Sequence, residues 1–182
     1  DGVRLGNAFC TTASCSPSRS VILTGLHNHA TGQYGLQHHF HKFRSYTNLA
    51  SLPVYLHHAG YRTARCGKLH VAPESVYQFD VVLPPPPARV GSRSTVAMAE
   101  ACESWIATDD ERPFFLYFCT SDPHRSGDTA DELPHAPNRF GNPAPGGEGY
   151  DRVTEVVYDP AEVVVPDFLP DTPTCRAELA QY

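Results

Sequence analysis

Residues 49–70 read LASLPVYLHHAGYRTARCGKLH, and this stretch decides the fold class that the sequence predicts. Apolar side chains recur over residues 49–58 at the spacing of one helix face, and Gly60 ends the pattern. Residues 61–66 then predict a strand. The polar residues 68–70 therefore follow the end of a strand directly.

The same order of elements occurs a second time. Residues 94–107 repeat the helical spacing, and residues 109–113 break it. Residues 114–119 form a continuous apolar run, which predicts a strand covered on both faces of a parallel sheet, and residues 122–124 follow it. We expect an α/β fold, with a doubly wound, mostly parallel sheet flanked by helices. Ligands bind beyond the carboxyl ends of the strands in such sheets.

Length and charge limit the functions that this chain can have. Its 182 residues, 41% of them hydrophobic, predict one domain over 1–182. The net charge of −6 argues against a nucleic-acid binder, and we expect no membrane span. Residues 134–173 are rich in Pro and Gly and predict an irregular segment, with a short edge strand at 163–165.

The motif Cys15-Ser-Pro-Ser-Arg19, followed by Leu23-Thr-Gly25, predicts a reactive site. Pro17 suits the first turn of a helix and Gly25 suits the position just past its end, so we expect a helix from about Pro17 to Thr24. Its free N–H groups and dipole would then face the Cys15 thiol and favour an anion there. The alternative is a small buried cysteine beside a surface arginine.

These residues resemble the sulfatase family motif, in which the cysteine is oxidised to formylglycine. Further segments agree with the family in order and spacing, namely Gly67-Lys-Leu-His70, residues 113–118 and Asp122-Pro-His-Arg125. Segments 34–36, 71–74, 77–80, 158–160 and 165–166 most resemble the family branch that removes N-linked sulfate from glucosamine in heparan-sulfate-type glycans. The alternatives are another sulfate-ester hydrolase of the family and a catalytically inactive fragment.

The resemblance implies a role for each candidate residue. Hydrated formylglycine made from Cys15 attacks sulfur, and Arg19 and Lys68 hold its hydroxyls. His70 takes the proton when sulfate leaves, and His124 protonates or positions the leaving group. Lys68 and His124 also bind substrate. These residue types suit the chemistry, since cations neutralise sulfuryl oxygens and histidines exchange protons near neutral pH.

The resemblance further implies a calcium ion, with Cys15 as formylglycine among its ligands. The family holds this ion with an Asp pair upstream of the cysteine motif and an Asp-Asn pair on a later strand. Neither pair is found in this sequence, and Asp1 is not assigned to the role. We therefore expect an N-terminal part of a longer catalytic domain, with an incomplete metal site.

The partners that the resemblance implies are a sulfated saccharide and a formylglycine-generating enzyme, and it leaves open a homodimer of the full-length protein. The implied location is lysosomal in an animal, and periplasmic or secreted in a bacterium. Ser126 stands where the related branch carries a cysteine, which weakens the lysosomal assignment.

The remaining histidines and cysteines permit other interpretations. His27-Asn-His29 and His38-His-Phe-His41 could bind zinc, but Lys42 and Arg44 would oppose a cation. A surface loop or the rim of a substrate pocket is the favoured interpretation of these histidines. Among the cysteines, we expect buried thiols at positions 66, 102 and 119.

Overall fold

The computed structural model describes residues 2–87, 93–125, 140, 142–143, 147–149, 152–153, 156 and 158–182. The chain divides into two compact units. The first unit consists of Asp1–Leu83 and Asp109–Cys119, and the second of Pro84–Thr108 and Thr120–Tyr182.

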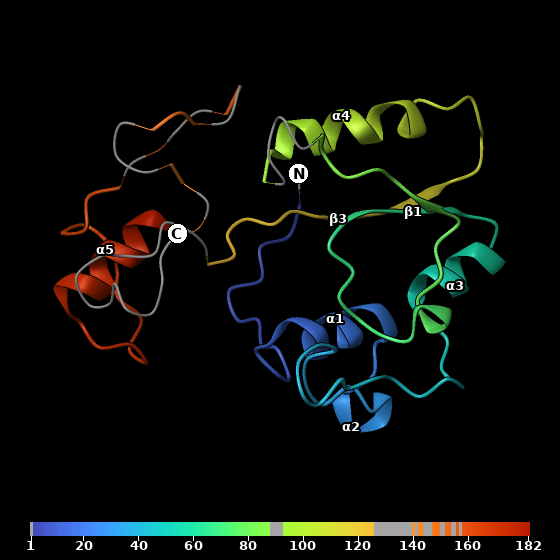
Figure 1. The fold of residues 1–182 in the computed structure, drawn as a ribbon, viewed down its shortest axis with the longest axis horizontal. Coiled ribbons are helices and arrows are strands. Elements are labelled where there is room, and N and C mark those ends of the chain that lie inside the picture. Colours follow the sequence, from blue (N-terminus) through green and yellow to red (C-terminus); the bar gives the residue numbers. More distant parts are fainter. Residues whose placement is uncertain are drawn as a thin grey trace. The chain divides into compact units, whose positions relative to one another are not determined.

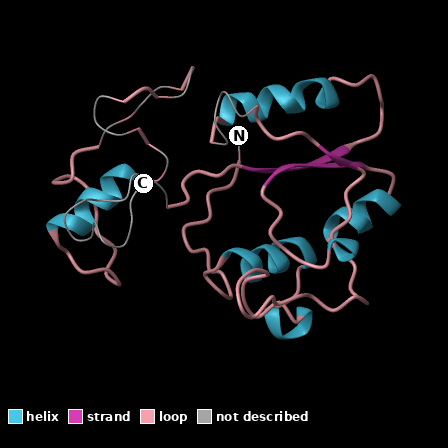
Figure 2. Ribbon diagram, in the orientation of Figure 1, coloured by secondary structure: helices cyan, strands magenta, loops and turns pink. Residues whose placement is uncertain are grey.

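The first unit contains a three-stranded parallel sheet (Figure 2). Strand β1 (Arg62–Gly67) lies between β2 (Val81–Val82) and β3 (Phe114–Cys119). Arg62 pairs with Phe114 at one end and Gly67 with Cys119 at the other. The two longer strands therefore end at the same edge of the sheet.

Three helices of the first unit lie on one side of this sheet (Figure 1). They are α1 (Cys15–Thr24), α2 (Asn28–Thr31) and α3 (Leu52–His58), and the short 3-10 helix η1 (Glu74–Val76) follows β1 in the chain. The second unit contains α4 (Thr95–Ile106), between β2 and β3 in sequence, and α5 (Pro173–Gln181). The α/β prediction, with a parallel sheet flanked by helices, is confirmed.

Local sequence signals explain where the helices begin and end. Helix α1 ends at Gly25, which has a φ of 70° and donates its N–H to the Val21 carbonyl. Helix α3 begins at Leu52, three residues later than predicted, because Ser51 has an extended backbone and Pro53 occupies the first turn. Leu49, predicted to lie in that helix, packs against the core instead.

Two other predictions need correction, and one helix was missed. Strand β3 has the predicted bounds, but Phe114 and Phe118 are 44% and 40% exposed, so this strand is not covered on both faces. Within the described part of the chain β3 pairs only with β1, as an edge strand does. Residues 163–165 form no strand. Helix α5 was not predicted, although Thr172 caps it by accepting the Cys175 N–H and Pro173 starts it.

The hydrophobic core of the first unit joins α1 to the segment that follows β1. Its buried members are Leu23, Leu69, Val71, Val76 and Tyr77. Leu69 and Val71 alternate with the half-buried Lys68 and His70. Burial of the apolar pair therefore fixes the backbone that carries the two polar side chains.

Asp80 ties the start of β1 to the chain that leads into β2. One carboxylate oxygen accepts the Thr63 N–H at 2.8 Å and the Thr63 hydroxyl at 3.1 Å, and the other lies 2.6 Å from His57 Nδ1. Burial raises the pKa of Asp80, but the bonds from Thr63 and the charge of His57 lower it by more, and the pKa ends below its ordinary value of 3.8.

We therefore expect Asp80→Ala to destabilise the full-length protein by about 1–3 kcal/mol, because the buried Thr63 amide loses its acceptor. A carboxylate with a depressed folded pKa stabilises the fold above its unfolded pKa, and this contribution is lost as pH falls through the folded pKa. The decrease in the free energy of unfolding, measured with denaturant, should consequently be largest at neutral pH and should shrink below about pH 4. An equal loss at all pH values would contradict the assignment.

Candidate active site

Cys15 is the first residue of α1 and is half-buried. Ser14 precedes it in an extended conformation, with φ −147° and ψ 152°. The helix thus starts at the cysteine, two residues earlier than predicted. The Cys15 Sγ lies 3.4 Å from the Lys68 Nζ, so residues 53 positions apart in sequence meet here.

Lys68 reaches this position from the end of β1. Its N–H donates to the Cys119 carbonyl at 3.2 Å, which extends the pairing of β1 and β3 by one residue. The buried Leu69 next to it anchors the backbone. A lysine at the carboxyl edge of a parallel sheet suits an anion-binding role, since ligands gather at that edge.

Arg19 lies one helical turn after Cys15 and links α1 to both long strands. Its Nη1 donates to the Lys68 carbonyl at 2.7 Å, the Tyr117 hydroxyl at 3.2 Å and the Cys119 Sγ at 3.1 Å. A guanidinium has five N–H donors, so these contacts leave the Nε and Nη2 donors for an anion. Arg19 therefore braces the Lys68 backbone, a role that sequence reasoning missed.

The electrostatics around Arg19 keep the group charged. Burial lowers the pKa of Arg19, but Cys119 and Tyr117 raise it by more, and the net pKa is above its ordinary value. Burial, followed by Cys119, raises the pKa of Tyr117 to about 12, so the phenol is neutral at physiological pH. Tyr117 and Cys119 are two residues apart in β3. Because side chains two residues apart in a strand point to the same face, the sequence could have indicated that these two lie together.

His70 contacts a second histidine. Its Nε2 lies 2.5 Å from His38 Nδ1, and the planes of the two rings are nearly parallel, with centroids 4.6 Å apart and an angle of 11° between the planes. His70 also has a φ of 54°, a left-handed conformation that is uncommon for residues other than glycine. The sequence predicted a role for His70 but not its contact with His38.

His124 belongs to the second unit. It follows β3 in the chain by five residues and is exposed. Its N–H donates to the Ser121 carbonyl at 2.9 Å, and its Nδ1 lies 3.0 Å from the Arg125 carbonyl. Asp122 forms an ion pair with Arg93. The role of His124 stays a prediction, and Ser126 lies outside the described residues.

Asn28 fastens the chain on both sides of Cys15. Its Oδ1 accepts the hydroxyls of Thr11 and Thr12 at 2.8 and 3.0 Å. Its Nδ2 donates to the carbonyls of Pro17 and Gln33 at 2.9 and 3.0 Å. The interpretation of residues 27–29 as a zinc-binding cluster gains no support, because His27 and His29 belong to no group of three or more His, Cys, Asp or Glu side chains among the described residues.

We expect Asn28→Asp to destabilise the full-length protein by about 1–3 kcal/mol, because the buried carbonyls of Pro17 and Gln33 would lose their donor. Thermal unfolding would measure this loss. The matched control is Asn48→Asp at an exposed turn of the same unit, for which we expect a change within about 0.5 kcal/mol. Equal effects at the two positions would contradict the role of Asn28.

The described residues do not fit a calcium ion. No three His, Cys, Asp or Glu side chains gather as a metal-ligand group within the described ranges. Calcium takes six to eight oxygen ligands, and Cys15 is accompanied here by the cation of Lys68. They do fit formylglycine, because the half-buried Cys15 starts a helix, with the Lys68 ammonium 3.4 Å away and Arg19 one helical turn later. The thiols of Cys66 and Cys102 are buried as predicted, whereas Cys119 is only partly so.

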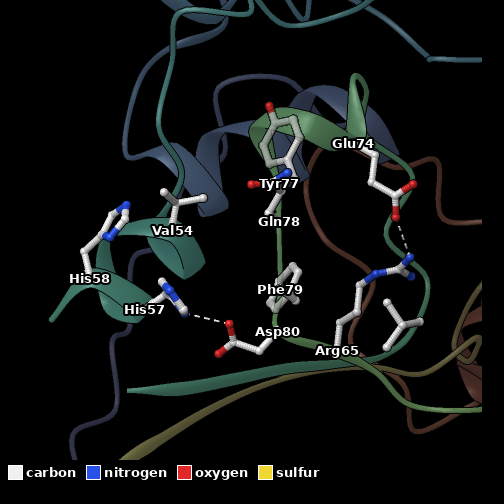
Figure 3. A pocket seen from close by; sticks show the side chains of 10 residues that line it. Val54, His57, His58, Arg65, Glu74, Tyr77, Gln78, Phe79 and Asp80 are labelled. Carbon is white, nitrogen blue, oxygen red and sulfur yellow. Dashed lines mark hydrogen bonds and ion pairs between the residues drawn. The ribbon is translucent and has the colours of Figure 1, made fainter. Parts of the chain in front are cut away.

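A pocket of about 370 Å³ lies elsewhere in the first unit, between α3 and the segment from Glu74 to Val82 (Figure 3). His57 points toward Asp80 on one side of it, and Arg65 pairs with Glu74 at 3.0 Å on the other. None of the five predicted catalytic residues lines this pocket. Four of its polar side chains, those of His57, Asp80, Arg65 and Glu74, are thus engaged in ion pairs.

Comparison with known proteins decides the family. The Sulfatase family matches residues 1–159, which is most of the chain. The chain belongs to the sulfatase family. This result agrees with the parallel sheet and with the position of Cys15 at the start of α1. None of the helices among the described residues is long and apolar enough to cross a membrane.

Individual sulfatases match to different extents. The chain is 42% identical to human N-sulphoglucosamine sulphohydrolase over 97% of its own length, and it spans 36% of that protein. It is 27% identical to an ulvan-active sulfatase of Formosa agariphila over 68% of the chain and 24% of the relative. Another sulfatase of Formosa agariphila is 37% identical over 42% of the chain and 16% of the relative. The chain thus covers about a third of the first of these sulfatases and less of the others.

Proposed function

We propose that the full-length protein hydrolyses a sulfate group, and that its substrate is the N-sulfate of glucosamine in heparan-sulfate-type glycans. The observation that carries this proposal is the meeting of Cys15, Lys68 and Arg19 at the carboxyl edge of the sheet. The choice of an N-sulfate rests on the 42% identity to the human N-sulphoglucosamine sulphohydrolase, which extends over nearly the whole chain.

Each of these side chains is assigned the step of sulfate hydrolysis that suits its position and its chemistry. Formylglycine at position 15 supplies, once hydrated, the hydroxyl that attacks sulfur. Lys68, whose Nζ lies 3.4 Å from the Cys15 side chain, neutralises negative charge on the sulfuryl oxygens. Arg19 holds the Lys68 backbone with Nη1 and offers its remaining donors to the same anion.

Proton transfers are assigned to the two histidines. His70 takes the proton as sulfate leaves, and His124 protonates or positions the leaving group. Substrate binding is assigned to Lys68 and His124. The described residues do not form a calcium site, so no step here passes through a metal.

The same proposal gives the protein its partners and location. A formylglycine-generating enzyme would modify Cys15, whose half-buried position leaves the thiol within reach. We propose the lysosome as the location in an animal, and the periplasm or the exterior in a bacterium. A second candidate function, hydrolysis of another sulfate ester, is favoured by the match to a relative that is named as an ulvan-active sulfatase.

Two substrates distinguish these functions. The full-length protein, produced in a host that matures sulfatases, is given glucosamine N-sulfate and glucosamine 6-O-sulfate, and the released sulfate is measured. We expect faster release from the N-sulfate. Faster release from the O-sulfate would favour the second function. Release from neither substrate, in protein whose Cys15 has been converted, would contradict the proposal.

A further inference from the structure

Loop 35–43 carries His38 and is anchored beside Cys15. Gln33, which is fully buried, donates from Nε2 to the carbonyls of Gly35 and Phe43 at 2.8 and 3.0 Å. The Phe43 N–H donates to the Leu36 carbonyl at 3.1 Å and closes the loop. Both ends of the loop are therefore fixed by the same side chain.

A further bond attaches the loop to α1. The Gln37 N–H donates to the hydroxyl of Ser16 at 3.1 Å, and Ser16 is fully buried next to Cys15. Gly35 packs directly on Phe43, since a Cβ at position 35 would lie 2.5 Å from the Phe43 ring. The backbone that presents His38 is thus held by buried polar bonds and by close packing.

We propose that His38 is a positioning residue for His70: its Nδ1 accepts the Nε2–H of His70 and fixes the orientation and the tautomer of that ring. This inference rests on the proposed function of His70 as the group that takes the proton. The 2.5 Å contact between the two nitrogens carries it, together with the angle of only 11° between the ring planes, because the N–H and the lone pair both lie in the planes of their rings. A histidine whose second nitrogen donates a hydrogen bond has one defined tautomer.

The surroundings of His38 favour the acceptor role. Burial, followed by the neighbouring charges of His39 and Lys68, lowers the pKa of His38, which favours the neutral ring that keeps a lone pair on Nδ1. When His70 gains a proton, its Nε2–H becomes part of an imidazolium, and a hydrogen bond from a charged donor is stronger than one from a neutral donor. His38 would therefore stabilise His70 in the protonated state.

Three variants of the full-length protein separate the hydrogen bond from the packing. His38→Phe keeps an aromatic ring but removes the acceptor. In His38→Asn the amide oxygen Oδ1 is separated from Cα by the same number of bonds as Nδ1 of histidine. This oxygen can therefore restore the acceptor. His58→Phe replaces an exposed histidine of α3 and serves as the matched control.

We expect His38→Phe to lower kcat for sulfate release about tenfold with little change in KM, because the reaction loses part of a proton-transfer contribution. His38→Asn should recover most of this loss, and His58→Phe should match the wild type. If His38→Phe left kcat unchanged, or if His38→Asn were as slow as His38→Phe, the proposal would be overturned.

A spectroscopic readout tests the contact without relying on activity. Nitrogen-15 NMR of labelled histidines in the full-length protein reports which ring nitrogen bears the proton, and the His70→Asn variant identifies the His70 signals. We expect a proton on Nε2 of His70 in the wild type and a mixture of tautomers in His38→Phe. A mixture in the wild type would overturn the positioning role, whereas absence of sulfate release from a protein with the expected tautomer would overturn only the proposed function.

Discussion

Cys15→Ala is expected to lower sulfate release by the full-length protein more than about a thousandfold, because the attacking group is made from this side chain. Cys15 is half-buried and contacts Lys68 Nζ only at 3.4 Å, so the substitution should change the free energy of unfolding by less than about 1 kcal/mol. The measurement is the rate of sulfate release, with thermal unfolding recorded beside it.

The control for this prediction is Cys10→Ala, which removes an exposed thiol five residues upstream. We expect activity equal to that of the wild type. Retention of activity in Cys15→Ala, or an equal loss in both variants, would exclude Cys15 as the source of the nucleophile.

Lys68→Met is expected to lower kcat by about 10²–10³, the size of the loss when one group that stabilises charge in a transition state is removed. Methionine keeps the length of the lysine stem, and Lys68 is only half-buried, so the fold should be retained. Steady-state kinetics with a sulfated substrate would measure the change.

The matched control is Lys42→Met, which removes an exposed positive charge from loop 35–43. We expect little change in kcat from that substitution. An equal decrease in the two variants would mean that general electrostatic attraction, and not the position of Lys68 beside Cys15, explains the loss.

Much of the fold was predictable because its signals are local. Gly25 and Gly60 mark the ends of two helices, and the apolar run 114–119 gave the bounds of β3. Helix α3 began later than expected because Ser51 and Pro53 set its first turn, against an apolar spacing that continued back to Leu49. A periodic pattern shows which face is buried but not where the backbone turns.

The site was predictable only where a motif named its residues. Cys15, Arg19, Lys68 and His70 followed from the resemblance to the family, and the structure places the Lys68 ammonium beside Cys15 and the Arg19 guanidinium on the Lys68 carbonyl. The contact of His38 with His70 joins positions 32 residues apart, and no spacing rule indicates it. The bonds of Arg19 to Tyr117 and Cys119 likewise depend on how α1 packs against β3, which the sequence does not show.

The central claim, that Cys15 is converted into the catalytic group, is tested most directly by mass spectrometry of the full-length protein from its native host. Trypsin releases residues 5–19, a peptide that contains both Cys10 and Cys15. We predict an aldehyde in place of the thiol at Cys15 and an unmodified thiol at Cys10. An intact thiol at Cys15, in a host whose other sulfatases carry the aldehyde, would contradict the claim.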